Sequence, residues 1–280
     1  MKKNFFFLLA VFFLLPPFTN ERDAGFIVAG GHTQYVNPFI GTQTDGSGAL
    51  SGGTFPGACV PLGMVQLSPD TELYPTWDPC SGYDYDHSRI YGFSHTHLSG
   101  TGCTDLFDVM LMPTDEECTL ETLTKGDFSQ SFTHDDEQAR PGYYQVRLHP
   151  SGINAELSAT PHAGIHRYTF PKEGSQTLIV DLDHSTYRGE DAYYTGKRTY
   201  QILAAQLRIV DDHTIEGWMR CTPETGGWGN GAGHAFYTVY FHAEFDKPFT
   251  NSGFWTADIP ADWERKREEV TSLPYLERVA

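Results

Sequence analysis

The feature that most constrains the fold is a succession of short segments that alternate apolar and polar residues between turns. They are residues 143–148, 154–159, 164–170 and 176–181. In the first segment, Tyr144, Val146 and Leu148 fall on one side, as they do in a half-buried β-strand. The segments follow one another closely, which favours strands that pair antiparallel with their neighbours.

Further segments of this kind extend over the rest of the chain. They are 58–68, which Pro61 and Gly63 interrupt, the apolar run 106–113, the hairpin pair 200–210 and 214–220, and the aromatic run 234–245. The 28 glycines and 17 prolines supply the turns that so many strands require. The pattern predicts an all-β fold, a large antiparallel β-sandwich in which alternate residues are buried between two sheets.

The two ends of the chain differ from this pattern. Residues 1–20 place two lysines before a run of Phe and Leu that ends at a Pro-Pro pair, which is typical of a secretory signal peptide. An uncleaved membrane anchor is the alternative.

The rest of the chain divides into three parts. Residues 21–32 form a polar lead-in, and 33–258 form the sandwich domain. Residues 259–280 are charged and helical in character, so they predict the start of a linker to a second domain that lies beyond the chain.

Charge and cysteine content exclude several classes of protein. The net charge of −17 argues against a nucleic-acid partner, because no basic stripe is present to displace counterions from phosphates. Export permits disulfides, but an odd count of five cysteines leaves at least one of them unpaired. No CxxC pair occurs, so a zinc ribbon has no support. We expect an exported protein with no transmembrane span once the signal peptide is cleaved.

The stretch 82–108, GYDYDHSRIYGFSHTHLSGTGCTDLFD, has an unusual composition. It combines aromatic rings, histidines, aspartates, hydroxyls and glycines, and Arg89 is its one basic residue apart from histidine. A core segment would be more aliphatic, and a solvated face would carry more Lys and Glu. The composition predicts a rigid polar surface that meets an uncharged, polyhydroxylated ligand.

His95 and His97 are separated by a single residue, and on a strand such residues face the same side. Two imidazoles on one side could bind zinc or iron together with a nearby carboxylate. The alternatives are polar core histidines or histidines that bind sugar hydroxyls. An HxH pair alone is a weak signal, and no metal ligand is assigned from it.

Paired carboxylates are what glycoside hydrolysis requires, and four aspartates lie near these histidines. They are Asp84, Asp86, Asp105 and Asp108. However, the chain carries 36 acidic residues, so some proximity is expected by chance. No GxSxG elbow and no phosphate-binding loop occurs. No catalytic residue is therefore assigned within this chain.

Aromatic residues with polar neighbours, in loops rich in Gly or Pro, are a stronger signal. Trp77-Asp78, Tyr83-Asp84 and Trp228-Gly229-Asn230 are of this kind. An aromatic face stacks on the C–H face of a sugar ring, while a carboxylate or imidazole binds the adjacent hydroxyls. Each tryptophan could equally plug its loop into the core. Together they favour a carbohydrate ligand.

Several longer motifs then identify a resemblance. YVNPFIGT at 35–42, GGTFPGACVPLGMVQLSPDT at 52–71, GYDYDHSRIYGFSHTHLSGTGCTD at 82–105 and LMPT at 111–114 resemble the amino-terminal domain of glycoside hydrolase family 92. The likeness continues through 141–171 and 234–249. Two departures stand out. Leu106-Phe107-Asp108 replaces a smaller Tyr-Gly-Asp-like run, and Cys80 and Cys103 lie near the motif and could pair.

The resemblance implies an exported, calcium-dependent, exo-acting and inverting α-mannosidase of the α-1,2 type that acts on N-glycan mannose. In such enzymes a β-sandwich precedes a helical linker and an (α/α) barrel. The general acid, the general base and the Ca²⁺ ligands come from the barrel. The chain would then be the substrate-facing half, inactive alone, in the periplasm or at the cell surface of a bacterium.

We expect the substrate, a mannose-containing glycan, to contact one set of side chains. They are Trp77, Tyr83, Asp84, His95, His97 and Thr101. Two other hypotheses remain open: a stand-alone lectin-like module that binds such glycans without cleaving them, and a metalloenzyme built on His95 and His97.

Overall fold

A computed structural model describes residues 31–44, 52–71, 80–100, 106–117, 119, 121–122, 127–171, 175–182, 184, 190–191, 197–198, 202–221 and 237–253. The predicted signal peptide 1–20 and the predicted linker 259–280 lie outside the described residues, as does the lead-in up to residue 30. Within the described ranges, no helix is long and apolar enough to cross a membrane.

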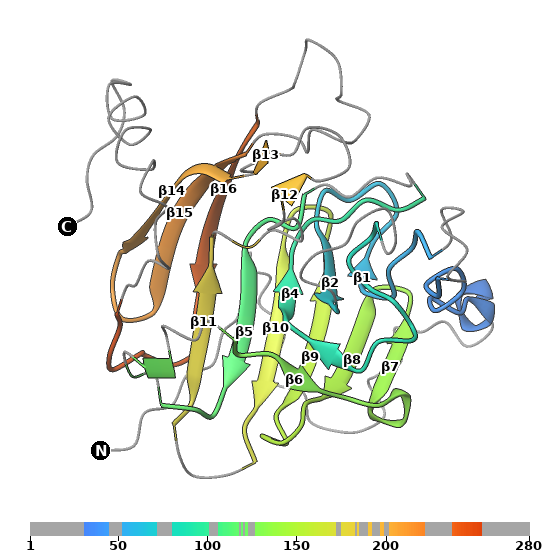
Figure 1. Cartoon of the computed structure of the whole chain (residues 1–280), viewed down its shortest axis with the longest axis horizontal. Coiled ribbons are helices and arrows are strands. Elements are labelled where there is room, and N and C mark those ends of the chain that lie inside the picture. Colours follow the sequence, from blue (N-terminus) through green and yellow to red (C-terminus); the bar gives the residue numbers. More distant parts are fainter. Residues whose placement is uncertain are drawn as a thin grey trace.

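The first sheet has five antiparallel strands. They are β1 (Ala58–Cys59), β2 (Gln66–Asp70), β4 (Gly92–Ser94), β5 (Met110–Thr114) and β11 (Thr177–Asp181), in the order β1-β2-β4-β5-β11. β5 is buried along its whole length, from Met110 to Thr114, which places it at the centre of the molecule. Figure 1 shows β5 and β11 side by side.

The second sheet is a four-stranded antiparallel meander behind the first (Figure 1). It contains β7 (Glu137–Arg140), β8 (Tyr143–Arg147), β9 (Asn154–Ala159) and β10 (Gly164–Thr169). The predicted alternation is confirmed, because Tyr144, Val146 and Leu148 are fully buried. These side chains join Leu67, Phe93 and Leu111 of the first sheet in one hydrophobic core, and this packing of two sheets confirms the all-β sandwich.

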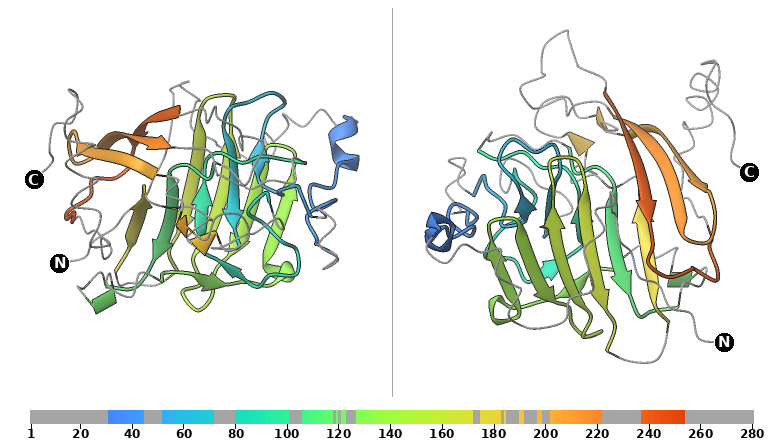
Figure 2. Two further views of the ribbon diagram at one scale, coloured as in Figure 1. Left: turned by 45° about the horizontal axis from the view of Figure 1, so that its top comes forward. Right: turned by 180° about the vertical axis from the view of Figure 1, so that it is seen from behind.

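A third antiparallel sheet stands beside the other two (Figure 2). It consists of β14 (Ile202–Ile209), β15 (Thr214–Cys221) and β16 (Tyr237–Glu244), in that order. The hairpin predicted from 200–220 is thus present. One face of this sheet is apolar, and its Ile215 and Ala243 belong to the main core. The other face carries polar side chains together with the aromatic Trp218 and Tyr240.

Short elements complete the described fold. They are the two-stranded pairs β3 (Arg89–Ile90) with β6 (Gln130–Ser131) and β12 (Glu190–Asp191) with β13 (Lys197–Arg198), and the 3-10 turns η1 (His32–Tyr35) and η2 (His134–Asp136).

Two predicted strands differ from the observed ones in their extent. The segment 58–68 forms β1 and the start of β2, because the turn at 61–64 separates them as its Pro and Gly suggest. The apolar run 106–113 does not begin as a strand. Leu106, Phe107 and Val109 have φ values of 78°, 66° and 52°, in the left-handed region that an extended strand cannot contain. The strand β5 starts only after them.

Candidate functional site

Residues 82–100 of the 82–108 motif enter the sandwich instead of lying over it. It begins at a turn in which Gly82 has φ +85°, and a side chain there would start 2.4 Å from Cε1 of Phe107. Glycine is needed at this position because of both the backbone conformation and the close approach of that ring. The chain then passes through β3 and β4 and continues into the segment that contains the two histidines.

Tyr83 is fully buried, and its hydroxyl donates to Oε1 of Glu137 at 2.7 Å. The other carboxylate oxygen of Glu137 accepts from the hydroxyl of Tyr144 at 2.6 Å. Burial and the Glu137 charge raise the pKa of both tyrosines well above the ordinary value. Tyr83 therefore connects the motif to the second sheet as a neutral hydrogen-bond donor.

Asp84 is 2% exposed and fixes the loop that follows the turn. Its carboxylate accepts from the hydroxyl of Thr44 and, at 2.8 Å, from the backbone N–H of Asp86. Its own N–H donates to Oγ1 of Thr71 at 2.8 Å. These contacts hold three segments of the chain together.

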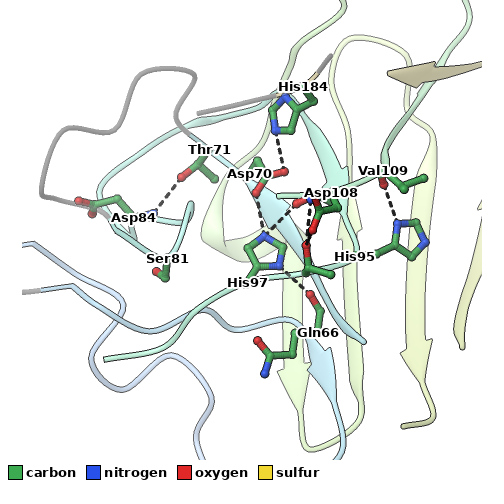
Figure 3. A network of polar contacts seen from close by, with 12 residues as sticks. Gln66, Asp70, Thr71, Ser81, Asp84, His95, His97, Asp108, Val109 and His184 are labelled. Carbon is green, nitrogen blue, oxygen red and sulfur yellow. Dashed lines mark hydrogen bonds and ion pairs between the residues drawn. The ribbon is translucent and has the colours of Figure 1, made fainter. Parts of the chain in front are cut away.

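His97 forms the centre of a buried ionic cluster, which Figure 3 shows. Its Nδ1 lies 2.6 Å from the carbonyl oxygen of Gln66, and its Nε2 lies 2.8 Å from Oδ1 of Asp70. Burial alone would raise the pKa of Asp70, but the charge and hydrogen bonds of His97 and His184 lower it to about 2. The carbonyl oxygen of Gln66 and the carboxylate of Asp70 are both acceptors, so each ring nitrogen of His97 is placed to donate to one of them, and Nε2 also lies 3.1 Å from the hydroxyl of Ser94.

His184 completes this cluster from the segment that follows β11. Its Nε2 donates to Oδ2 of Asp70 at 3.1 Å, and the side chain is 1% exposed. Its Nδ1 is buried and makes no hydrogen bond with any described residue. We refer to Asp70, His97 and His184 as the Asp70 cluster. It ties together the end of β2 and two segments far away in the sequence.

His95 belongs to a second and electrically neutral chain of hydrogen bonds. Its Nδ1 donates to the carbonyl oxygen of Val109 at 2.6 Å, so its Nε2 accepts from Nε2 of His166 at 3.0 Å. Nδ1 of His166 then accepts from the hydroxyl of Tyr168 at 2.8 Å. Burial lowers the pKa of His95 to about 4, and burial together with His95 lowers the pKa of His166 well below its ordinary value.

Asp108 connects the motif to the third sheet. Its Oδ2 accepts from Thr96 at 2.6 Å, and its Oδ1 accepts from the hydroxyl of Tyr237 at 3.1 Å and the thiol of Cys221 at 3.3 Å. Burial raises the pKa of this carboxyl group despite those donors. A buried acid with a raised pKa can be a proton donor, but Asp108 is 1% exposed, and its described partners make it a structural junction.

The predicted substrate-binding residues fall into two groups. Tyr83, Asp84, His95 and His97 are described and buried, and each is held by the partners given above. Trp77 and Thr101 lie outside the described residues. Contact with a substrate stays a prediction for all six, and the burial of four of them favours a supporting role.

The two histidines do not form the pair that their spacing suggested. They follow β4, which ends at Ser94, and they have separate partners: His97 contacts Asp70, and His95 contacts His166. Across the described ranges, no group of three or more His, Cys, Asp or Glu side chains could hold a metal ion. The zinc or iron site considered for His95 and His97 therefore has no third ligand of these types among the described residues.

The carboxylate pairs considered from the sequence have different surroundings. Asp84 and Asp108 each have their own donors, and Asp86 accepts from Gln43 on the exposed side of its loop. Asp105, Cys103 and the aromatic loop at 228–230 lie outside the described residues.

Sequence analysis did not identify several residues on which the site depends. Asp70, Glu137, His166 and His184 have partners 27, 54, 71 and 114 positions away. The one available signal was an acid at the end of a strand, at Asp70, and a single acid of that kind is not specific.

Comparison with known proteins gives a consistent result. Residues 35–275 match the family model described as the glycosyl hydrolase family 92 N-terminal domain. A protein from Arthroderma benhamiae described as an uncharacterized secreted glycosidase is 31% identical over 163 residues, which cover 55% of this chain and 20% of that protein.

Solved structures of the same family are similar in fold. A family GH92 α-mannosidase from Bacteroides thetaiotaomicron, also solved in complex with mannoimidazole, is 34% identical, with a TM-score of 0.62 over 78% of this chain. The family GH92 glycosyl hydrolase ccman5 is 28% identical, with a TM-score of 0.57 over 77% of this chain. This chain covers 26% of the length of each of these two proteins.

Proposed function

Because this chain belongs to glycosyl hydrolase family 92 through its N-terminal domain, we propose that it supplies the N-terminal β-sandwich of an exported, exo-acting α-mannosidase. The observation that carries the proposal is the family match over nearly the whole described fold, together with 34% identity to an α-mannosidase. The substrate class would be mannose-terminated glycans, and cleavage would invert the anomeric centre.

In this proposal the sandwich positions the substrate, and a second domain breaks the bond. The general acid, the general base and any Ca²⁺ ligands would belong to an (α/α) barrel that packs against the sandwich. The role proposed for this chain is to hold the sugar, and the chemistry that Ca²⁺ would supply is assigned to the barrel. The chain itself would bind and orient the sugar.

The buried residues of the motif would act by holding loops in place. Asp70 lies two residues before the segment 72–79, which contains Trp77, and His97 lies four residues before Thr101. The ionic contact between Asp70 and His97 fixes the positions of these two residues, from which the segments with Trp77 and Thr101 follow. The loops that carry the two predicted sugar contacts would thus begin from a rigid base, which limits the entropy lost on binding.

The proposal is tested by replacing the N-terminal domain of the B. thetaiotaomicron α-mannosidase with this chain. We expect the chimera to hydrolyse an aryl α-mannoside in the presence of Ca²⁺, and we expect this chain alone to show no turnover. Turnover by the chain alone would contradict the division of labour. A folded but inactive chimera, combined with saccharide binding by this chain, would favour the lectin-like alternative.

Export is a separate part of the proposal. It rests on residues 1–20 and on the secreted glycosidase of A. benhamiae. Expression in a Gram-negative host followed by fractionation tests it. Mature protein in the periplasm or at the cell surface, shortened at its amino terminus, is expected, and full-length protein in the cytoplasm would contradict it.

A further inference from the structure

The outer face of the third sheet carries an exposed aromatic pair. Tyr240 on β16 is 76% exposed, and its register partner on β15 is Trp218, which is partly exposed. Directly opposed residues of antiparallel strands have Cβ atoms about 4.5–5.5 Å apart. The two aromatic side chains therefore leave the sheet next to each other on its outer face, whereas the other face of the sheet buries Ile215, Met219 and Ala243.

The indole of Trp218 is held in place by the third strand. Its Nε1 donates to Oε1 of Gln206 at 2.7 Å, and Gln206 is the register partner of Trp218 on β14. Since the amide oxygen accepts this bond, the amide NH₂ of Gln206 is the end that can donate to a ligand. One row across three strands thus presents an amide, an indole and a phenol.

The neighbouring row is polar, and contacts among its own side chains hold it in place. Arg208 on β14 contacts Glu216 on β15, with its Nε 3.0 Å from Oε1, and His242 on β16 lies 3.9 Å from the same carboxylate. These side chains are 62%, 39% and 54% exposed, so they remain accessible. Their mutual contacts hold donors and acceptors beside the aromatic row without using their full hydrogen-bonding capacity.

The charge of this face argues for a neutral occupant. Alternation along the strands adds Arg220 and Glu244 to the same side, so two arginines balance two glutamates on this face. The chain as a whole has a net charge of −17. A surface that is balanced in so acidic a protein gives no electrostatic attraction to a polyanion or a polycation.

We propose that Trp218, Tyr240 and Gln206, with the row of Arg208, Glu216 and His242, form a binding site for a neutral saccharide on the outer face of β14–β16. The rings would stack on the C–H faces of sugar units, and the polar row would bind their hydroxyls. The choice of ligand class rests on the proposed function. The site itself lies on the face opposite the core of this sheet, and none of its residues belongs to the 82–108 motif.

Affinity electrophoresis of the full chain in gels that contain soluble α-mannan tests the site. We expect mannan to retard the parent chain and Tyr240→Ala to weaken the apparent affinity about 5- to 10-fold, as the loss of one stacked ring predicts. Tyr240→Phe, which keeps the ring, should stay within about 3-fold of the parent. Tyr35→Ala is the matched control, because Tyr35 is 79% exposed at a distant position in η1.

Each outcome gives a clear answer. Mannan binding by Tyr240→Ala as tight as that of the parent would place binding elsewhere and overturn the inference, while leaving the proposed function standing. No retardation of the parent, or retardation by polygalacturonate in place of mannan, would also overturn it. An inactive chimera with Tyr240-dependent mannan binding would overturn the proposed function and leave this site intact.

Discussion

The interior around Asp70 and the outer face of β14–β16 contain the same kinds of side chain in opposite settings. Both combine histidines, carboxylates and aromatic rings. In the interior, Asp70 and His97 have side chains that are 0% exposed, whereas on the outer face Arg208 is 62% exposed and His242 is 54% exposed. The comparison teaches that a polar, aromatic composition does not by itself indicate a surface. Satisfied hydrogen bonds allow the same residues to form a core.

The largest expected difference concerns the charge of Asp70. Asp70→Asn removes the buried negative charge that His97 and His184 contact, and breaking a buried ion pair in this way costs about 3–5 kcal/mol. Glu216→Gln, the same change of acid to amide in the exposed pair with Arg208, should cost about 0–1 kcal/mol. Urea unfolding of both variants measures the two losses. Equal losses in the free energy of unfolding would contradict this prediction, because the buried Asp70 cluster would then stabilise the fold no more than the exposed pair of Arg208 and Glu216.

A pH titration of stability separates the two regions next. The pKa of His95 is lowered to about 4 in the folded state, against about 6.5 in an unfolded chain, so the unfolded state binds more protons between these values. Stability is therefore fully present above pH 6.5 and falls as the pH drops towards 4, by about 3 kcal/mol from His95 alone. The lowered pKa of His166 acts in the same direction.

The matched histidine substitution on the outer face is His242→Asn. The His242 side chain is 54% exposed, so this variant should change the free energy of unfolding at pH 7 by less than about 0.5 kcal/mol. If the free energy of unfolding of the parent were flat between pH 6.5 and 4.5, the buried neutral pair of His95 and His166 would be refuted.

These two predictions also show what sequence reasoning can reach. The strands were predictable because alternation and turn residues are local, and β9 was found with the same ends, 154–159. The polar interior was not, because its contacts are distant: 71 positions separate His95 from His166, and 129 separate Asp108 from Tyr237. Nothing in the sequence around His97 indicates that it meets Asp70 rather than solvent.

A smaller effect is expected at a strained surface turn. Leu62 has φ 61° and is fully exposed, so Leu62→Gly should relieve about 1–2 kcal/mol of left-handed strain. The added freedom of glycine in the unfolded chain costs about 0.5–1 kcal/mol, which leaves a net gain in stability of up to about 1.5 kcal/mol.

Met64→Gly is the matched control for this turn. Met64 is 65% exposed and has no left-handed conformation, so glycine there should only destabilise. The interior offers the contrasting case of Phe107, which has φ 66° but a fully buried ring. Thermal unfolding of Leu62→Gly and Met64→Gly measures the two changes in stability. A loss of stability in Leu62→Gly would contradict the proposed backbone strain at Leu62.

The smallest effect is expected for Tyr240→Ala on the outer face. Because the side chain is 76% exposed, its removal should change the free energy of unfolding by less than about 0.5 kcal/mol. Urea unfolding of this variant therefore also shows whether weaker mannan binding reflects a lost contact. A loss above about 2 kcal/mol would mean that the ring is part of the packing and that the outer face is not free.

One experiment compares the two regions within a single sample. The chain, labelled with ¹³C in the rings of histidine and tyrosine, is titrated with an α-linked mannotriose and followed by NMR. The account predicts that the Tyr240 and His242 signals shift with the sugar while those of His95 and His166 stay in place. Shifts at the buried histidines with an unmoved Tyr240 would contradict it, because the motif interior would then be the part that meets the ligand.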